Sequence, residues 1–365
     1  MKIIENTLFV LSIFFGIFFL GPEIEAPNLE LPLPKIPSSL YELENWINTQ
    51  EAAIDNIKPD NASQLEFYDS IPQKTDYSVL YLHGFSASSK EGDPVHRNIA
   101  RALKANLYLP RLSDHGLIEK EPMLNFTGQK YIDDAREALA VAKKIGQKVI
   151  VISSSTGGTL SLILGNDPQI AALLMFSSNI EIYDSRSKLL TLPWGLQIAQ
   201  LVLGSKYHIM NNITEQKKNY WTTRYRLEPT IELQKLIETG MRPEIFKRIT
   251  APVFMGYYYK NQEEQDKVVS IPAMLKMFDQ LGTSDGKKQK MAFPDAGDHV
   301  ITSRLSSPNH LQVERAARLF LQKQFNVQLN YYSILVNILF TFLFYIIFSG
   351  LFHYYQKLIF GAQSF

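Results

Sequence analysis

The chain has 365 residues, 45% of them hydrophobic and 20% charged, so it can bury a sizeable core in one large domain or two ordinary ones. Its 37 basic and 36 acidic residues give a net charge of +1, which offers no electrostatic basis for binding nucleic acid or another polyanion. The absence of cysteine excludes disulfides, thiolate nucleophiles and cysteine zinc sites.

Residues 1–21 contain the first segment that departs from this composition. The run Thr7 to Leu20 (TLFVLSIFFGIFFL) is uncharged and rich in phenylalanine. It suits either a signal-peptide core or a short membrane anchor. Because no convincing small-x-small cleavage site follows it, the sequence favours an uncleaved N-terminal anchor or signal-anchor.

The second such segment, residues 331–352, carries no charge over the length of a bilayer-spanning helix and has tyrosines at both ends. It predicts a C-terminal transmembrane helix, with a buried core helix as the alternative. The two segments together predict an integral membrane protein that contacts membrane lipid. Its sidedness stays open, because Lys2 and Lys357 favour one orientation and Arg315 and Arg318 the other.

The chain between these segments begins with a proline-rich stretch. Residues 22–37 hold five prolines, which favour an extended, stiff tether. A helix is expected over 39–57, with Ser38 or Ser39 as its N-cap. Residues 38–326 are predicted to form the folded domain.

Short apolar strands then alternate with amphipathic helices. The expected strands cover about 78–85, 106–112, 148–154, 171–178, 251–259 and 288–295, and the expected helices about 97–105, 131–146, 156–165, 271–282 and 310–325. This alternation indicates an α/β domain with a mostly parallel sheet and helices on both faces. Reactive groups in such sheets collect at the carboxyl ends of the strands.

The run Val149 to Gly158, V-I-V-I-S-S-S-T-G-G, leads from a strand into a helix through three serines. A nucleophile elbow needs its serine on a strained strand-to-helix turn, with small residues two positions away on either side. Counting back from Gly157 makes Ser155 the candidate nucleophile and puts Ser153 where that pattern has a glycine. The same serines suit an ordinary helix N-cap, and this segment alone does not separate the two interpretations.

A serine nucleophile needs an imidazole base that a carboxylate holds in one tautomer. Of the seven histidines, His299 has the most suitable position, after the last expected strand and before the last helix. Asp266 follows the fifth expected strand and is the candidate acid. Glu263 and Glu264 are competing acids, whereas Asp298 is expected to shape the loop rather than to orient the ring.

A strand that ends in His83-Gly84 presents backbone N–H groups at the same edge of the sheet. The amides of Phe85 and Thr156 are therefore the predicted oxyanion-hole donors. His-Gly after a strand is a common turn and weak evidence by itself. The order His-Gly, Ser, Asp, His, with each element at an expected strand end, predicts a catalytic site.

On these residues the sequence resembles the α/β-hydrolase superfamily, and within it the monoacylglycerol-lipase and carboxylesterase-like serine hydrolases. The resemblance covers YLHGF, SSSTGG, DKVVS and GDHVITS, and it departs from the pattern at Ser153. It implies a sheet of about eight strands, no metal or organic cofactor, and a cap after the fourth expected strand. Residues 179–248 fit this cap, whose aromatic side chains either line an acyl pocket or pack the cap onto the core.

These observations favour a membrane-anchored serine hydrolase that cleaves carboxylic esters through an acyl-enzyme intermediate. Ser155 would attack the carbonyl, His299 would take and return the proton, and Asp266 would hold the imidazole. The substrate is a small-molecule or lipid ester, and lipid-derived acyl esters are preferred because the two expected anchors would hold the site near a bilayer. An amidase, peptidase or thioesterase with the same triad, and a non-catalytic binding protein with this fold, are the alternatives.

Overall fold

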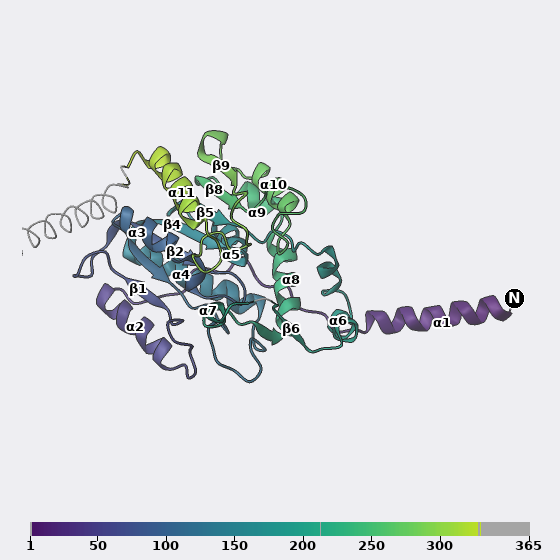
Figure 1. Ribbon diagram of the computed structural model, residues 1–365. Helices are drawn as coiled ribbons and strands as arrows, with labels where there is room; N and C mark the ends of the chain where they lie inside the picture. The colour runs from purple at the N-terminus through teal and green to yellow at the C-terminus, as the bar shows by residue number, and fades with distance from the viewer. Residues whose placement is uncertain (1, 212, 328, 330–365) are drawn as a thin grey trace, which may run out of the picture. The chain divides into compact units, whose positions relative to one another are not determined.

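A central sheet organises the chain in the computed structural model, which describes residues 2–211, 213–327 and 329. The strands of this sheet are β1 (Gln64–Glu66), β2 (Thr75–Leu82), β3 (Asn106–Leu109), β4 (Gly146–Ser154), β5 (Ile170–Phe176), β8 (Val253–Tyr257) and β9 (Lys288–Ala292). They follow the order β1-β3-β2-β4-β5-β8-β9 (Figure 1). All neighbours pair in parallel except the edge strand β1, which pairs antiparallel with β3.

The sheet is mostly parallel, as predicted, but in the described residues it has seven strands rather than about eight. Before β2 the chain contributes only β1, which is three residues long and lacks the apolar alternation that marks a strand in sequence. The six longer strands coincide with the expected ones. The pattern of short apolar runs therefore located the sheet, and missed its short polar edge.

Helices cover both faces of the sheet. The helices of the described chain are α1 (Lys2–Phe19), α2 (Leu40–Ala52), α3 (Val95–Ala102), α4 (Gly128–Ile145), α5 (Thr156–Leu164), α6 (Gly195–Leu203), α7 (Glu215–Lys218), α8 (Glu228–Gly240), α9 (Pro243–Lys247), α10 (Ile271–Asp279) and α11 (His310–Phe325). Three 3₁₀ turns, η1 (Ser89–Gly92), η2 (Ser185–Leu189) and η3 (Asp285–Lys287), and a hairpin of β6 (Tyr207–Ile209) with β7 (Arg224–Arg226) complete the elements.

Alternate residues of the central strands pack against different helices, as the two-residue period of a strand requires. Val149 and Val151 of β4 belong to a core cluster that also contains buried residues of α4, α5, α8 and α10. On β8, Phe254 packs against Phe320 of α11, with ring centroids 5.7 Å apart. The strands are thus buried on both faces, which explains why they appear in the sequence as continuous apolar runs.

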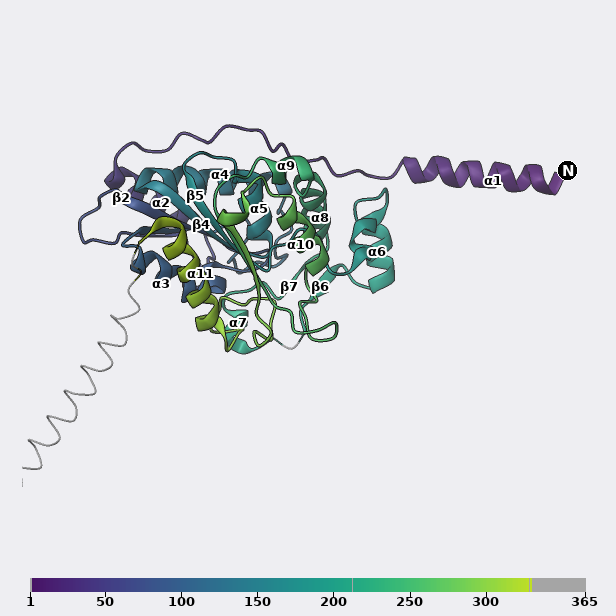
Figure 2. The ribbon, with the colours of Figure 1, turned by 90° about the horizontal axis from the view of Figure 1, so that it is seen from above.

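The proline-rich stretch 22–37 has no helix or strand, as expected, but it packs along the domain. The Asn28 amide donates to Gln129 Oε1 at 2.7 Å, and Arg136 Nη2 donates to the Asn28 carbonyl at 2.9 Å. Glu30 pairs with Arg248 at 2.7 Å. The stretch therefore runs in extended form past α9 and α4 to α2 (Figure 2).

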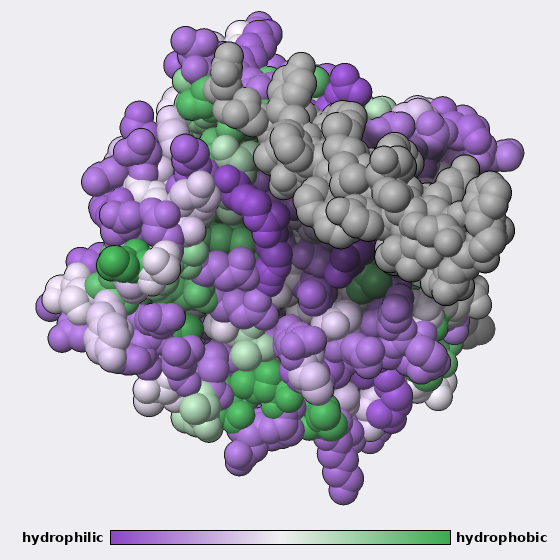
Figure 3. Space-filling model, turned by 60° about the vertical axis from the view of Figure 1, so that its left-hand side comes forward, coloured by the Kyte–Doolittle hydropathy of each residue, from purple (hydrophilic) through white to green (hydrophobic). Residues whose placement is uncertain are grey.

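The predicted membrane localisation is wrong. Among the residues that the structure describes, no helix has the length and apolar character needed to cross a bilayer. α1 contains the first expected anchor, but it is 18 residues long and has Lys2 and Glu5 near its start, so its apolar part falls short of the roughly 20 residues that a span needs. The second expected span, 331–352, lies outside the described residues. On the face in Figure 3, hydrophilic residues predominate and hydrophobic ones form small separate areas.

The turn from β4 into α5 passes very close to the end of β2. A Cβ atom added at Gly157 would lie 2.0 Å from the Leu82 carbonyl oxygen, and one added at Gly158 would lie 2.4 Å from Ser178 Oγ. Neither distance leaves room for a methyl group. Glycine at 157 therefore fixes how closely the start of α5 approaches its neighbouring strand.

Gly157→Ala is expected to lower the free energy of unfolding by about 3 kcal/mol, because its methyl group would overlap a backbone carbonyl that cannot rotate away. Chemical denaturation measures this loss. Gly286→Ala is the matched control, since a Cβ atom there meets nothing within 4 Å; its stability should change by less than about 1 kcal/mol. Equal effects of the two substitutions would contradict this account of the turn.

Candidate active site

The four segments singled out in the sequence lie at the carboxyl edge of the sheet. His83 and Gly84 follow β2, and Ser155 follows β4. Asp266 and His299 lie on the loops that follow β8 and β9. Because β2, β4, β8 and β9 are parallel to their neighbours, their carboxyl ends share one edge, where active sites of such sheets form.

Ser155 sits on a strained backbone turn. Its φ of 51° and ψ of −121° lie in a region that residues with a side chain rarely adopt. The turn is held by hydrogen bonds from the Ser155 amide to the Phe176 carbonyl at 3.0 Å and from the Gly158 amide to the Ser155 carbonyl at 2.8 Å. This is the geometry of a nucleophile elbow, and Ser155 as a whole residue is 7% exposed.

Ser153, which stands where the elbow pattern has a glycine, is fully buried. Its Oγ lies 2.8 Å from Ser161 Oγ on α5, and Ser161 Oγ also donates to the Gly157 carbonyl at 2.9 Å. The extra hydroxyl therefore has a partner on the helix that follows the turn. A second serine, four residues along α5 from Gly157, accommodates the departure from the pattern.

His299 and Asp266 form a close pair. His299 Nδ1 lies 2.6 Å from Asp266 Oδ2, and the Asp266 side chain is completely buried. The other oxygen, Oδ1, accepts the amides of Val268 and Val269 at 2.9 and 3.2 Å. His299 Nε2 is buried and makes no hydrogen bond with any described residue, Ser155 included. It is the nitrogen that a general base would present, and catalytic contacts of this kind often tighten only when substrate binds.

The charges of this pair support each other. Burial alone would raise the pKa of Asp266, but the attraction of His299 and the hydrogen bonds that Asp266 accepts outweigh burial and hold its pKa below the ordinary value. Burial likewise opposes the charged form of His299, yet the charge and hydrogen bond of Asp266, with smaller contributions from Glu91 and Asp298, raise the pKa of the imidazole.

A small excursion of the chain brings Asp266 back to the end of β8. Tyr259 and Gln265 form an antiparallel bridge, and the Asp266 amide donates to the Tyr258 carbonyl at 3.2 Å. The competing acids Glu263 and Glu264 lie at the exposed tip of this excursion. Of the three acids, only Asp266 reaches His299.

The His-Gly turn lies beside the candidate nucleophile. A Cβ atom at Gly84 would be 2.9 Å from Ser155 Cβ, so only glycine allows this approach. Tyr131 Oη donates to the His83 carbonyl at 3.0 Å and anchors the turn from α4. The amides of Phe85 and Thr156 follow Gly84 and Ser155 directly, and within the described ranges neither donates a hydrogen bond to another protein atom. Both amides are thus available as oxyanion donors.

Residues of the segment 179–248 bind to the loop of His299 and to the turn that contains Phe85. Lys217 Nζ pairs with Asp298 Oδ2 at 2.9 Å, while Asp298 Oδ1 accepts the Val300 amide at 2.8 Å. The Thr222 amide donates to the Ser86 carbonyl at 2.7 Å, and Trp221 packs with Val300. Asp298 therefore shapes the loop beside His299 and does not orient the ring.

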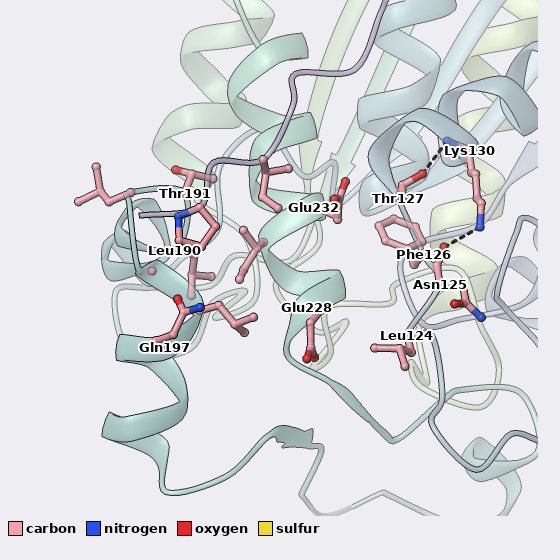
Figure 4. Close-up of a pocket in the computed structure, with 16 residues that line it drawn as sticks. Leu124, Asn125, Phe126, Thr127, Lys130, Leu190, Thr191, Gln197, Glu228 and Glu232 are labelled. Atoms are coloured by element: carbon pink, nitrogen blue, oxygen red, sulfur yellow. Dashed lines mark hydrogen bonds between the residues drawn. The ribbon is translucent and has the colours of Figure 1, made fainter. Parts of the chain in front are cut away.

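A pocket of about 380 Å³ opens between the start of α4 and the helices α6 and α8 (Figure 4). Its apolar lining includes Leu124, Phe126, Leu192, Leu196 and Ile231. The charged residues Lys130, Glu228 and Glu232 also line it. None of the candidate triad or oxyanion residues lines it.

Phe126, in the lining of the pocket, packs against Phe85 of the His-Gly turn through its aromatic ring. Phe126 is edge-on to Phe85, with ring centroids 5.1 Å apart, and Phe85 also packs on Tyr225 of β7 at 5.3 Å.

Glu91 is a further buried acid at the site, and the sequence did not single it out. It follows the His-Gly turn within η1 and contacts the Gly84 amide. Its position in a polar turn, S-S-K-E-G-D, gives no sign of burial; the only available signal is its proximity in sequence to His83-Gly84. Among the described residues, no cluster of three or more histidine, aspartate or glutamate side chains is arranged to hold a metal ion.

No protein-family model and no curated protein matches this sequence. Solved structures do match the fold. A structure reported for LipS and LipT, metagenome-derived lipolytic enzymes, has a TM-score of 0.54 and 17% identity and covers 73% of this chain and 99% of its own. A monoacylglycerol lipase from Paleococcus ferrophilus has a TM-score of 0.51 and 12% identity, covering 72% and 98%. At these identities the likeness establishes the fold: the chain has the α/β-hydrolase fold.

The raised pKa of His299 predicts how activity depends on pH. A general base must be neutral, and a raised pKa keeps the imidazole protonated up to a higher pH. The ester kcat/KM is therefore expected to fall on acidification, with a midpoint above about 6.5, the ordinary value for histidine. Initial rates across pH 5 to 9, with circular dichroism as the control for folding, measure it. A midpoint at or below that value would contradict the pairing with Asp266.

Ser153→Gly is expected to keep kcat/KM within about threefold of wild type and to lower the free energy of unfolding by about 1 kcal/mol, because only the hydrogen bond to Ser161 is lost. Ester kinetics and urea denaturation measure the two effects. Ser161→Ala removes the same bond together with the contacts of Ser161 Oγ with the Gly157 and Gly158 carbonyls, so its loss of stability should be at least as large. A large loss of kcat/KM with unchanged stability would mean that the Ser153 hydroxyl acts on the reaction.

Proposed function

We propose that the protein is a serine hydrolase that cleaves carboxylic esters. Ser155 attacks the ester carbonyl, and His299 accepts its proton and returns it to the leaving alcohol. Water then hydrolyses the acyl-enzyme by the same route. Asp266 holds the imidazole in one tautomer and stabilises its protonated form, and the amides of Phe85 and Thr156 stabilise the oxyanion of each tetrahedral intermediate.

The observation that carries this proposal is the 2.6 Å contact between His299 and a fully buried Asp266, at the sheet edge where Ser155 occupies a strained elbow. A solvated loop histidine has no reason to meet a buried carboxylate at this distance. A serine that merely capped α5 would also have no reason to adopt a positive φ, because N-cap residues are normally extended. The buried pair of His299 and Asp266 and the strained backbone of Ser155 each lower stability, and a catalytic site uses both.

The preference for esters with an apolar acyl group is now supported by different features. No described helix spans a bilayer, so anchoring in a membrane gives this preference no support. The support comes instead from the pocket of about 380 Å³ next to Phe126, whose largely apolar wall suits an alkyl chain. Two proteins with the same fold are also named as lipolytic, one of them as a monoacylglycerol lipase.

A fluorophosphonate probe tests the nucleophile. Wild type and Ser153→Gly should be labelled, because both keep the Ser155 hydroxyl, and Ser155→Ala should not. Ester hydrolysis by Ser155→Ala should fall by about 10⁴-fold or more. The substrates are p-nitrophenyl butyrate and decanoate, with a matched anilide and a thioester to compare bond types.

A well-folded wild type that is neither labelled nor active on any of these substrates would overturn the enzyme assignment and favour a binding protein. Faster turnover of the anilide or thioester than of both esters would overturn the ester assignment and leave the nucleophile in place.

A further inference from the structure

Glu91 is a buried acid that the proposed mechanism does not use. Glu91 lies in η1 and is 2% exposed. Oε2 accepts the Gly84 amide at 2.6 Å and the Tyr81 hydroxyl at 3.2 Å. No lysine or arginine of the described chain forms an ion pair with it, and the largest influences on its pKa come from burial, the Gly84 amide and His299. A buried carboxyl without a cation is uncommon, because burial strongly disfavours an unpaired charge.

The position of Glu91 links it to the candidate nucleophile. A Cβ atom built at Gly84 would lie 2.8 Å from Glu91 Oε1 and 2.9 Å from Ser155 Cβ. The carboxyl and the nucleophile therefore pack against the same point of the His-Gly turn. By holding the Gly84 amide, the carboxyl also fixes the peptide that precedes the Phe85 amide.

The titratable groups that face Glu91 come from three other elements. They are Tyr81 on β2, Tyr131 on α4 and His299 on the loop after β9. Burial raises the pKa of Glu91 to about 7, although the Gly84 amide, His299 and Tyr81 favour its charged form. His299 in turn experiences negative charge from Asp266, Glu91 and Asp298. His299 is the one histidine among these groups, so a proton on its ring is the natural counter-charge for Glu91.

We propose that Glu91 is a positioning residue of this site: in its ionised form it acts with Asp266 to stabilise the protonated ring of His299, while its Oε2 anchors the Gly84 amide of the oxyanion turn. The effect of Glu91 on catalysis rests on the proposed function, in which His299 is the general base. Two carboxylates would then share the stabilisation of one imidazolium, Asp266 through a hydrogen bond and Glu91 through its charge alone. The mechanism needs that stabilisation whenever His299 carries the proton of Ser155.

Glu91→Gln tests the charge, because the amide oxygen can still accept the Gly84 N–H but the side chain is never ionised. Loss of a nearby negative charge should lower the pKa of His299 by about 0.5 to 1 unit. The acid limb of the pH profile of kcat/KM should therefore move to lower pH, and kcat above this limb should fall about threefold to tenfold, the factor that corresponds to such a shift. KM should change little, because Glu91 does not contact the substrate.

A direct measurement separates this inference from the proposed function. The pKa of His299 is followed by NMR of ¹⁵N-labelled histidine in Ser155→Ala, with and without Glu91→Gln, and the signal is assigned with His299→Asn. A lower pKa in the double variant supports the inference even if the protein hydrolyses no ester tested. An unchanged pKa overturns it even if Ser155 proves to be the nucleophile.

Asp134→Asn is the matched control. Asp134 is also a buried carboxyl that accepts a backbone amide, that of Ser113, at 2.6 Å, and burial raises its pKa to about 6. The main influences on its pKa are burial, Ser113, Arg111 and Asp114, and His299 is not among them. Its substitution should cost stability but leave the acid limb and the pKa of His299 in place. An equal shift in both variants would mean that loss of any buried carboxyl moves the profile, and would overturn the specific role of Glu91.

Discussion

The approach of the β4–α5 turn to the end of β2 is the constraint on which the rest of the site depends. Gly157 lies against the Leu82 carbonyl and Gly84 lies against Ser155, so one glycine at the start of α5 and one in the turn after β2 let the two turns touch. With the turns in contact, Ser155 and Thr156 on one turn lie beside the His-Gly turn that leads to Phe85. The strained backbone at Ser155 persists because this packing, and the hydrogen bond to Phe176, leave it no alternative.

Charge interactions with His299 add to this packing. Three acids act on His299, and each has a different second partner: backbone amides for Asp266, Lys217 for Asp298, and the Gly84 amide for Glu91. Because Lys217 already pairs with Asp298, that acid is the most nearly neutralised of the three. Burial opposes the charges of Asp266, Glu91 and His299, and each of these groups has a hydrogen-bond donor or an opposite charge beside it.

Much of this arrangement could be predicted from the sequence because it is local. Apolar runs located the six longer strands, and glycines and polar residues at their ends indicated Ser155, His299 and His83-Gly84. Asp266 could be predicted from its place between Ser155 and His299 in the chain, because its separation from His299 has room for one helix and one strand. Glu91 could not be found this way, since nothing in a polar turn indicates burial beneath a neighbouring strand end. The contacts of Lys217 and Thr222 were equally hidden, because they join positions more than 80 residues apart. The membrane interpretation of α1 failed because composition alone overstated the usable apolar length.

The contacts made by α7 and by the residues after it limit which sequence changes this segment can tolerate. Lys217 and Thr222 are tied to the loop of His299 and to the turn of Phe85, so an insertion or deletion between them would disturb both halves of the chemistry at once. α6, which lines the pocket together with residues 190–192 just before it, carries many exposed side chains, and within the described residues it makes no such contact with the two loops of the site. Within this segment, sequence drift that alters substrate preference has most freedom around α6 and least around α7.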